Sequence, residues 1–268
     1  MWLRRPAVRA FADRAHVPST VESRFMTDFL TDFGVQPDWE LHARGGGNSF
    51  IQMSTELLAG LDRPLPALDA ALLAYHLPDL KVVEVAGCFL TEHCDGSPTV
   101  FSVAGQGVGA PFTALRILRS MRLADELTDG AVFVIDQSTI PYRDPDTHDG
   151  EVRDCVALLC TDAVGADDAA VLEFVSERPV VDLADALTVV LRRNPGARVV
   201  AGRMLASRLG EEFLAQNGIV AGPRRQLCTS VWAAVAENWP QDSPVVVADY
   251  DPHAGRLFQA GLRPGVQS

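Results

Sequence analysis

The sequence predicts a layered α/β protein, and three observations support this fold class. Apolar segments with a two-residue period alternate with segments whose apolar residues recur at helical spacing. The chain has 268 residues and is 47% hydrophobic, which is enough for one substantial core or for two fused half-domains. Two stretches also repeat the same order of helix, loop and strand. Together these features are typical of sheets covered by helices.

Nine strands and six helices are expected along the chain. The strands are short apolar runs, at residues 8–14, 68–75, 100–104, 131–136, 155–161, 171–175, 198–201, 245–250 and 257–262. The helices fall at residues 50–61, 81–89, 111–123, 183–193, 204–217 and 229–239. Pro111 suits the first turn of a helix, because an N–H group at that position makes no hydrogen bond within the helix. Asp182 can cap the helix that begins at Leu183. Pro195 ends that helix, because proline cannot continue it.

The repeated stretches are residues 115–137 and 229–251. Each is read as an amphipathic helix, a short polar loop and an apolar strand that ends in an acid, Asp136 in one and Asp249 in the other. Another apolar strand follows each of them. The repetition predicts one domain, residues 1–268, made of two pseudo-equivalent halves at about 1–165 and 166–268. A chance match within an ordinary α/β chain remains the alternative.

Charge and composition narrow the class of partner. The formal net charge is −12 and no run of lysine or arginine interrupts it, so nucleic acid and anionic membranes are poor partners. No apolar run reaches the roughly 20 residues of a membrane span, and no targeting segment is visible, so a cytoplasmic protein is expected. The five cysteines form no regular framework, and His93 with Cys94 lacks a second ligand pair at zinc spacing. Free thiols and no bound metal are expected.

Residues 101–118, FSVAGQGVGAPFTALRIL, are read as a strand, a glycine loop and a helix. One hypothesis is a dinucleotide site for an oxidoreductase. Gly105, Gly107 and Gly109 could let a pyrophosphate approach the start of the helix, and Asp136 could bind the ribose hydroxyls. The 31-residue spacing from Gly105 to Asp136 and the missing N–H of Pro111 weaken it.

The same loop resembles the thiolase superfamily, in particular the ketosynthase III (β-ketoacyl-acyl-carrier-protein synthase III) group. In that group a Phe-Asp-x-Ser-x-x-Cys-x-Gly-Phe stretch opens a buried helix with the nucleophilic cysteine. Phe101 and Gly109 match this stretch, Ser102 replaces the aspartate, and Gly107 stands at the position of the cysteine. The resemblance implies a thiolase-like layered fold with two pseudo-equivalent halves.

The C-terminal half is similar to the same group. Residues 245–263 resemble its closing hairpin, and residues 224–239 resemble the helix that normally begins Gly-Asn-Thr-Ser. Leu227 and Cys228 replace the Gly-Asn pair there, whereas Thr229 and Ser230 are kept. Residues 197–213 fall where the group has a His-Gln-Ala-Asn stretch, and they contain no histidine. All three catalytic groups of the condensation reaction are therefore expected to be absent.

The resemblance implies a degenerate subunit in acyl or polyketide-type natural product biosynthesis. It would pair through strand 100–104 with a catalytic ketosynthase III-like paralogue, or with a second copy of itself, and it would need no cofactor. An unpaired apolar strand edge is otherwise an aggregation risk. The alternative is an acyltransferase that acts on carrier-protein or coenzyme A thioesters through other residues.

Five residues are candidates for such remaining chemistry. Cys228 opens a helix, whose dipole favours a thiolate, and His253 could serve as its base. Gln106 precedes the lost nucleophile and could support decarboxylation alone. Ser102 lies inside a strand and is expected to be structural. His76 follows a strand, where α/β sheets often bind ligands, although a turn residue is the commoner role.

Overall fold

The structure, a computed structural model, describes residues 1–162 and 168–265. The boundary expected between the halves, at residues 165 and 166, lies outside the described residues. The described strands are β1 (Trp2–Leu3), β2 (Ala7–Ala10), β3 (Ala70–Tyr75), β4 (Thr99–Val103), β5 (Gly130–Asp136), β6 (Cys155–Asp162), β7 (Ala170–Pro179), β8 (Arg198–Ala201), β9 (Val220–Ala221), β10 (Val245–Asp251) and β11 (Arg256–Pro264).

Helices of very different length connect these strands. They are α1 (Thr20–Asp32), α2 (Trp39–Ala43), α3 (Phe50–Ala59), α4 (Ala86–His93), the short 3₁₀ helix η1 (Gly107–Gly109), α5 (Ala110–Leu123), α6 (Pro145–His148), α7 (Leu183–Arg193), α8 (Arg203–Leu209), α9 (Glu211–Gln216) and α10 (Ser230–Glu237). Within the described residues, no helix combines the length and the apolar character that crossing a bilayer requires.

The strand order confirms the two pseudo-equivalent halves of a mixed α/β protein. The order is β4-β3-β5-β6-β1-β7-β11-β10-β8-β9, and β2 pairs with β6 beside this path. From one end, β4, β3 and β5 are parallel and β6 is antiparallel. From the other end, β9, β8 and β10 are parallel and β11 is antiparallel. In the chain, α5 lies between β4 and β5, just as α10 lies between β9 and β10, so each half has the same helix in the same place.

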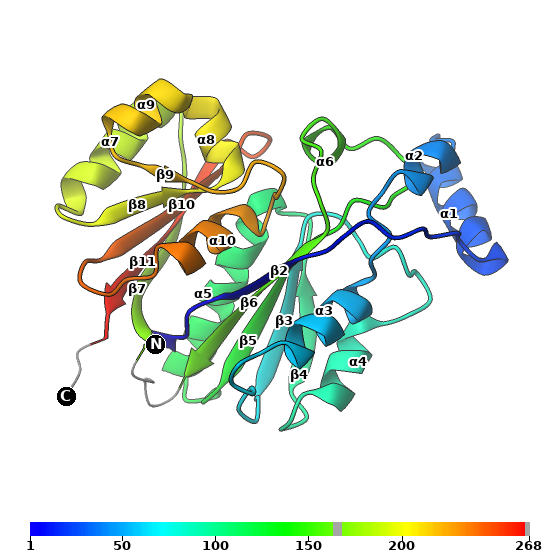
Figure 1. The fold of residues 1–268 in the computed structure, drawn as a ribbon, viewed down its shortest axis with the longest axis horizontal. Coiled ribbons are helices and arrows are strands. Elements are labelled where there is room, and N and C mark those ends of the chain that lie inside the picture. Colours follow the sequence, from blue (N-terminus) through cyan, green and yellow to red (C-terminus); the bar gives the residue numbers. More distant parts are fainter. Residues whose placement is uncertain (163–167, 266–268) are drawn as a thin grey trace.

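Helices cover both faces of each half of the sheet (Figure 1). Alternate side chains of β5 point to opposite sides: Val132 and Val134 join a central core with α5 and α10, whereas Phe133 joins an outer core with α3 and α4. On the other half, α7, α8 and α9 form a second outer core with β8 and β10. Strands buried on both faces carry apolar residues at nearly every position, which is why they stand out in the sequence.

Several expected elements are shifted or divided. The expected helix 204–217 is two helices, α8 and α9, because Gly210 has φ +81° between them. The expected helix 81–89 begins later, at Ala86, and the expected strand 8–14 is shorter and ends at Ala10. Residues 20–32 were left unassigned, yet they form α1. Its signal is a capping box, in which Ser19 accepts from the Glu22 N–H and Glu22 accepts from the Ser19 N–H.

Candidate functional site

The glycine loop packs tightly against the C-terminal half. Gly107 has φ +48°, and a Cβ atom there would lie 2.7 Å from Asp251 Oδ2. A Cβ atom on Gly109 would clash with the ring of Phe258. Val108 and Gly109 are buried, so the start of α5 is enclosed by protein. The glycines are needed for this close approach.

The dinucleotide interpretation is not supported by this arrangement. A carboxylate, Asp251, lies beside the loop where a pyrophosphate would have to bind. The expected ribose ligand, Asp136, is buried and accepts hydrogen bonds from the N–H groups of Leu227 at 2.7 Å, Cys228 at 2.7 Å and Thr229 at 3.0 Å. The Thr229 hydroxyl also donates to it, at 2.5 Å. Asp136 therefore satisfies the free N–H groups where α10 begins.

The candidate nucleophile Cys228 lies next to Gly107 of the glycine loop. Its Sγ donates to the carbonyl oxygen of Gly107 at 3.4 Å, so these two distant segments meet as the resemblance implies. The side chain is almost completely buried. Burial, and then the carboxylates of Asp136 and Asp249, raise the pKa of the Cys228 thiol well above its ordinary value. A thiolate is therefore disfavoured at this position.

The turn from β8 into α8 also lacks space for a side chain. Gly202 connects β8 to α8, and a Cβ atom there would clash with the carboxylate of Asp249. Asp249 Oδ1 accepts from the N–H groups of Leu205 at 3.0 Å and Tyr250 at 2.9 Å. Its Oδ2 has no hydrogen-bond partner in the described part of the chain, and burial raises the pKa of Asp249 to about 7. A larger side chain at position 202 would displace this buried carboxylate.

Two histidine–aspartate pairs line a cavity of about 330 Å³ beside the glycine loop. His76 follows β3, and its Nε2 lies 3.1 Å from Oδ1 of Asp144, the residue that caps α6. His253 lies in the turn between β10 and β11, and its Nε2 lies 3.0 Å from Oδ2 of Asp146. Each pair joins segments that are far apart in the sequence. The second pair connects the two halves.

The partly buried pair, His76 and Asp144, has shifted pKa values. Burial opposes the charged form of both residues, but the hydrogen bonds from His76 and Thr147 and the charge of His76 lower the pKa of Asp144 to about 2. For His76 the same balance, burial against the hydrogen bond and charge of Asp144, raises the pKa above its ordinary value. The pair is therefore stabilised as an imidazolium–carboxylate pair.

The remaining candidates lie elsewhere. Gln106 is exposed, and its Oε1 accepts from the Thr113 hydroxyl at 2.6 Å. Ser102 is exposed on β4, and neither residue lines the cavity. Cys228 does not line it either, and His253, its proposed base, is bonded to Asp146. In the described ranges there is no group of three or more histidine, cysteine, aspartate or glutamate residues that could hold a metal.

Sequence reasoning missed the three carboxylates of this cavity, Asp144, Asp146 and Asp251. A signal existed for two of them, because Asp-Pro marks a helix start at Asp144 and a turn at Asp251. Nothing local showed that these turns meet His76. Their proximity depends on the packing of one half against the other.

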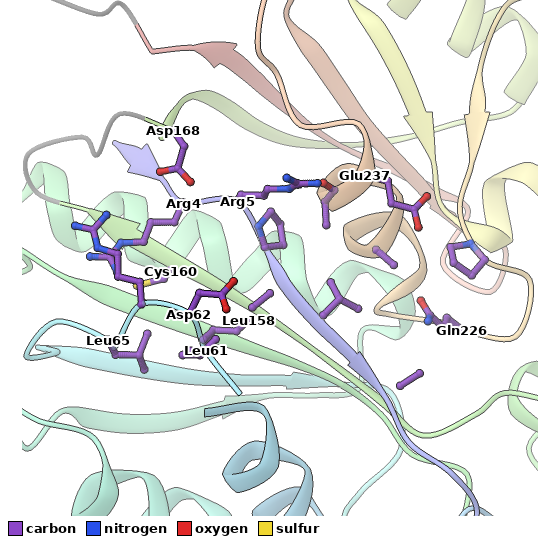
Figure 2. Close-up of a pocket in the computed structure, with 18 residues that line it drawn as sticks. Arg4, Arg5, Leu61, Asp62, Leu65, Leu158, Cys160, Asp168, Gln226 and Glu237 are labelled. Carbon is purple, nitrogen blue, oxygen red and sulfur yellow. The ribbon is translucent and has the colours of Figure 1, made fainter. Parts of the chain in front are cut away.

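A larger cavity of about 760 Å³ lies between β2, the loop after α3, and α10 (Figure 2). Its charged side chains balance, with Arg4, Arg5 and Arg63 against Asp62, Asp168 and Glu237. Arg5 Nε donates to the Ala236 carbonyl at 2.6 Å. No histidine, serine or threonine lines this cavity. We therefore place the candidate site at the smaller cavity, where acid–base groups converge.

Comparison with known proteins identifies the fold. No protein-family model matches the chain, and no curated protein matches it in sequence. One similar solved structure is ChlB3, named an acyltransferase, with a TM-score of 0.64 and 14% sequence identity over 98% of this chain and 97% of that one. Another is AbyA1, a tetronic acid condensing enzyme, with a TM-score of 0.63 and 13% identity over 97% of this chain and 99% of that one. The 3-oxoacyl-(acyl carrier protein) synthase III of Pseudomonas aeruginosa PAO1 is also similar (0.57, 12%, 99% of both chains). The chain therefore has a thiolase-like layered fold.

Proposed function

We propose that this chain is a non-catalytic ketosynthase III-like subunit that assists a catalytic paralogue in acyl or polyketide-type biosynthesis. One observation carries the proposal. At the start of α5, where a nucleophile would stand, the chain has Gly107, and the space for a side chain there is taken by the carboxylate of Asp251. Similar structures are named as acyltransferase and condensing enzymes, and a structure of OleA from Xanthomonas campestris contains lauric acid and lauroyl-CoA. Those names support acyl groups as the relevant class of compound.

The neighbouring groups support the absence of covalent chemistry. Acyl transfer through a cysteine needs a thiolate and a base, or a lowered thiol pKa. Cys228, the nearest thiol, has the opposite shift, and its hydrogen bond is to a backbone carbonyl. Residues 197–213, which resemble the histidine stretch of the ketosynthase III group, contain no histidine. We infer that the chain takes up no acyl group from a thioester.

Intact-protein mass spectrometry tests this function. After incubation with acetyl-, malonyl- and lauroyl-thioesters of coenzyme A, we expect no mass increase on this chain, and adducts only on a catalytic partner when one is present. The comparison variant is Cys228→Ala, which keeps the other four cysteines and should behave as the unchanged protein does. An adduct that is lost in Cys228→Ala would instead establish an acyltransferase and would refute the non-catalytic assignment.

Restoring a cysteine should not restore acylation. In Gly107→Cys the new Cβ must move the Asp251 carboxylate, which then stands beside the thiol and disfavours the thiolate. We expect no adduct from this variant, whereas the double variant Gly107→Cys with Asp251→Gly should react with iodoacetamide at least tenfold faster than the single variant. Equal rates in the two variants would contradict this account of the site.

The edge of β4 supports pairing with a second thiolase-like subunit. β4 ends the strand order, so one side of it has no neighbouring strand among the described residues. The loop before α4 carries Val83 and Val85, which are 58% and 63% exposed, and α4 packs on β4 where Gly87 faces Val100. Apolar side chains beside an unpaired strand edge are a usual feature of a subunit interface. The partner would continue the sheet across β4.

Charged substitutions on this surface should prevent pairing. We expect Val83→Asp with Val85→Asp to convert the assembly to single chains in light scattering after size exclusion, because the carboxylates would be buried against the partner. Val181, in the loop before α7, is fully exposed and provides the matched variant Val181→Asp, which should leave the assembly intact. An assembly that withstands the double substitution would place the interface elsewhere.

A further inference from the structure

The cavity beside the glycine loop has the composition of a ligand site. At about 330 Å³ it is at the small end of the range for small-molecule pockets, roughly 300–1,000 Å³. Part of its wall is apolar, from Val108, Met204 and Leu227. The rest of the argument concerns the polar groups, whose charges and free atoms indicate what kind of ligand fits.

Asp251 presents to the cavity a carboxylate oxygen that has no donor among the described residues. The residue is 8% exposed, and its Oδ1 accepts from the N–H groups of His253 at 2.8 Å and Ala254 at 3.1 Å. Oδ2 has no hydrogen bond within the described ranges, and it points towards Gly107, which also lines the cavity. This oxygen remains open to the cavity, unlike Oδ2 of Asp249, which is fully buried. A ligand in the cavity can therefore donate a hydrogen bond to it.

The surrounding charges favour a cation. Asp144 and Asp146 line the same cavity, the imidazolium of His76 offsets the charge of Asp144, and no lysine or arginine among the described residues lines the cavity. Both oxygens of Asp144 are engaged, by His76 and by the Thr147 N–H. Asp146 is bonded through Oδ2 to His253, which leaves Oδ1 without a hydrogen bond in the described residues. The nearest arginine, Arg203, donates to the backbone carbonyl of Asp146.

We propose that this cavity binds a small primary alkylammonium compound. Its ammonium group donates hydrogen bonds to Asp251 Oδ2 and Asp146 Oδ1, and its alkyl part contacts Val108, Met204 and Leu227. The carboxylates repel free anions such as phosphate or a fatty acid, so the site selects amines over the acids of similar length. This site is independent of the proposed pairing through β4.

Three probes of equal length and different charge test the proposal. n-Butylammonium, n-butanol and n-butyrate are titrated at pH 7.5 and 150 mM NaCl, with binding followed by saturation-transfer NMR and calorimetry. We expect butylammonium to bind with a Kd of about 1–10 mM, which suits so small a ligand. Butanol should bind at least tenfold more weakly, and butyrate should not bind.

Variants separate this site from general attraction to an acidic protein. Asp251→Asn keeps the Oδ1 acceptor of the turn, so it should fold, and it should weaken butylammonium binding at least tenfold. Asp62→Asn removes one charge at the other cavity and should leave the Kd unchanged. If circular dichroism shows that Asp251→Asn is unfolded, Asp146→Asn takes its place, with an expected loss of at least fivefold.

Three results would overturn the assignment. Absence of saturation transfer at about 50 mM butylammonium excludes the site. Equal affinity for butanol shows that the carboxylates play no part. An unchanged Kd in Asp251→Asn, or an equal loss in Asp62→Asn, shows that the cation binds only to the general negative charge of the protein.

Discussion

Replacing Asp136 by alanine should lower the free energy of unfolding by about 4 kcal/mol. Its carboxylate accepts four hydrogen bonds at the start of α10, from the N–H groups of residues 227–229 and from the Thr229 hydroxyl. All of these donors are buried, and each would cost about 1–3 kcal/mol if it were left without a partner, although local rearrangement recovers part of that sum. The effect extends through α10, because Trp232 on this helix is fully buried against Phe112 of α5.

Urea unfolding followed by circular dichroism measures this loss. Asp62→Ala is the matched control, since that carboxylate is exposed and its removal should change the free energy by less than about 0.5 kcal/mol. Asp136→Asn keeps one acceptor oxygen, so its free energy of unfolding should fall by about 2 kcal/mol. This loss lies between those of Asp62→Ala and Asp136→Ala. If Asp136→Ala lost less than about 1 kcal/mol, the start of α10 would have other acceptors and this carboxylate would not be what holds it.

Much of the fold could be predicted because the strands are sandwiched between helices. β5 and β10 were expected to within one residue, since both of their faces are buried and each begins with an apolar run that ends at an acid, Asp136 or Asp249. α7 matches the expected 183–193, because Asp182 caps one end and Pro195 follows the other. Residues that act on their neighbours in the chain are visible in the sequence.

Elements that depend on distant contacts were less visible. The apolar period continues from α8 into α9, so nothing but Gly210 marked the break between them. β2 stops at Ala10, and the next N–H, of Phe11, bonds to the Asp154 carbonyl in a loop far along the chain. Such a pairing has no local signal.

In the candidate site, too, some features could be predicted from the sequence and others depend on contacts between distant segments. The resemblance aligned Gly107 and Cys228 with two lost catalytic groups, and these residues do lie in contact. Which groups now occupy the site could not be read from the sequence, because Asp251 reaches Gly107 only when the hairpin of one half folds over the loop of the other. The expected base, His253, likewise found its partner in α6.

Asp249 should make the protein less stable as the pH rises from 4 to 8. Burial raises its pKa from 3.8 to about 7 in the folded state, so between these values the folded protein keeps a proton that the unfolded chain releases. The stabilisation is complete below pH 3.8 and is lost as the pH rises through 7. A difference of about 3 pH units corresponds to about 4 kcal/mol.

The contribution of Asp144 to stability changes with pH in the opposite direction to that of Asp249, so the two contributions can be told apart. Its folded pKa of about 2 lies below 3.8, so its contribution is present above pH 3.8 and is lost as the pH falls through 2. Stability should therefore be greatest near pH 4–5. His76, whose pKa is raised, adds to the decline only above about pH 6.5, and it does so equally in variants that keep it.

The variant Asp249→Asn isolates the contribution of Asp249. Its amide oxygen can still accept from the Leu205 and Tyr250 N–H groups, while the group no longer ionises. Urea unfolding at pH 4.5, 6, 7 and 8 should show a steeper decline in the unchanged protein than in the variant, with the exposed Asp28→Asn as the control. A smaller decline remains in the variant, because burial also raises the pKa of Asp79 to about 6. If both proteins declined equally, the proton would reside on another group. A flat profile in both would mean that Asp249 is already ionised at pH 4.5, and that Gly202 faces a charged carboxylate throughout.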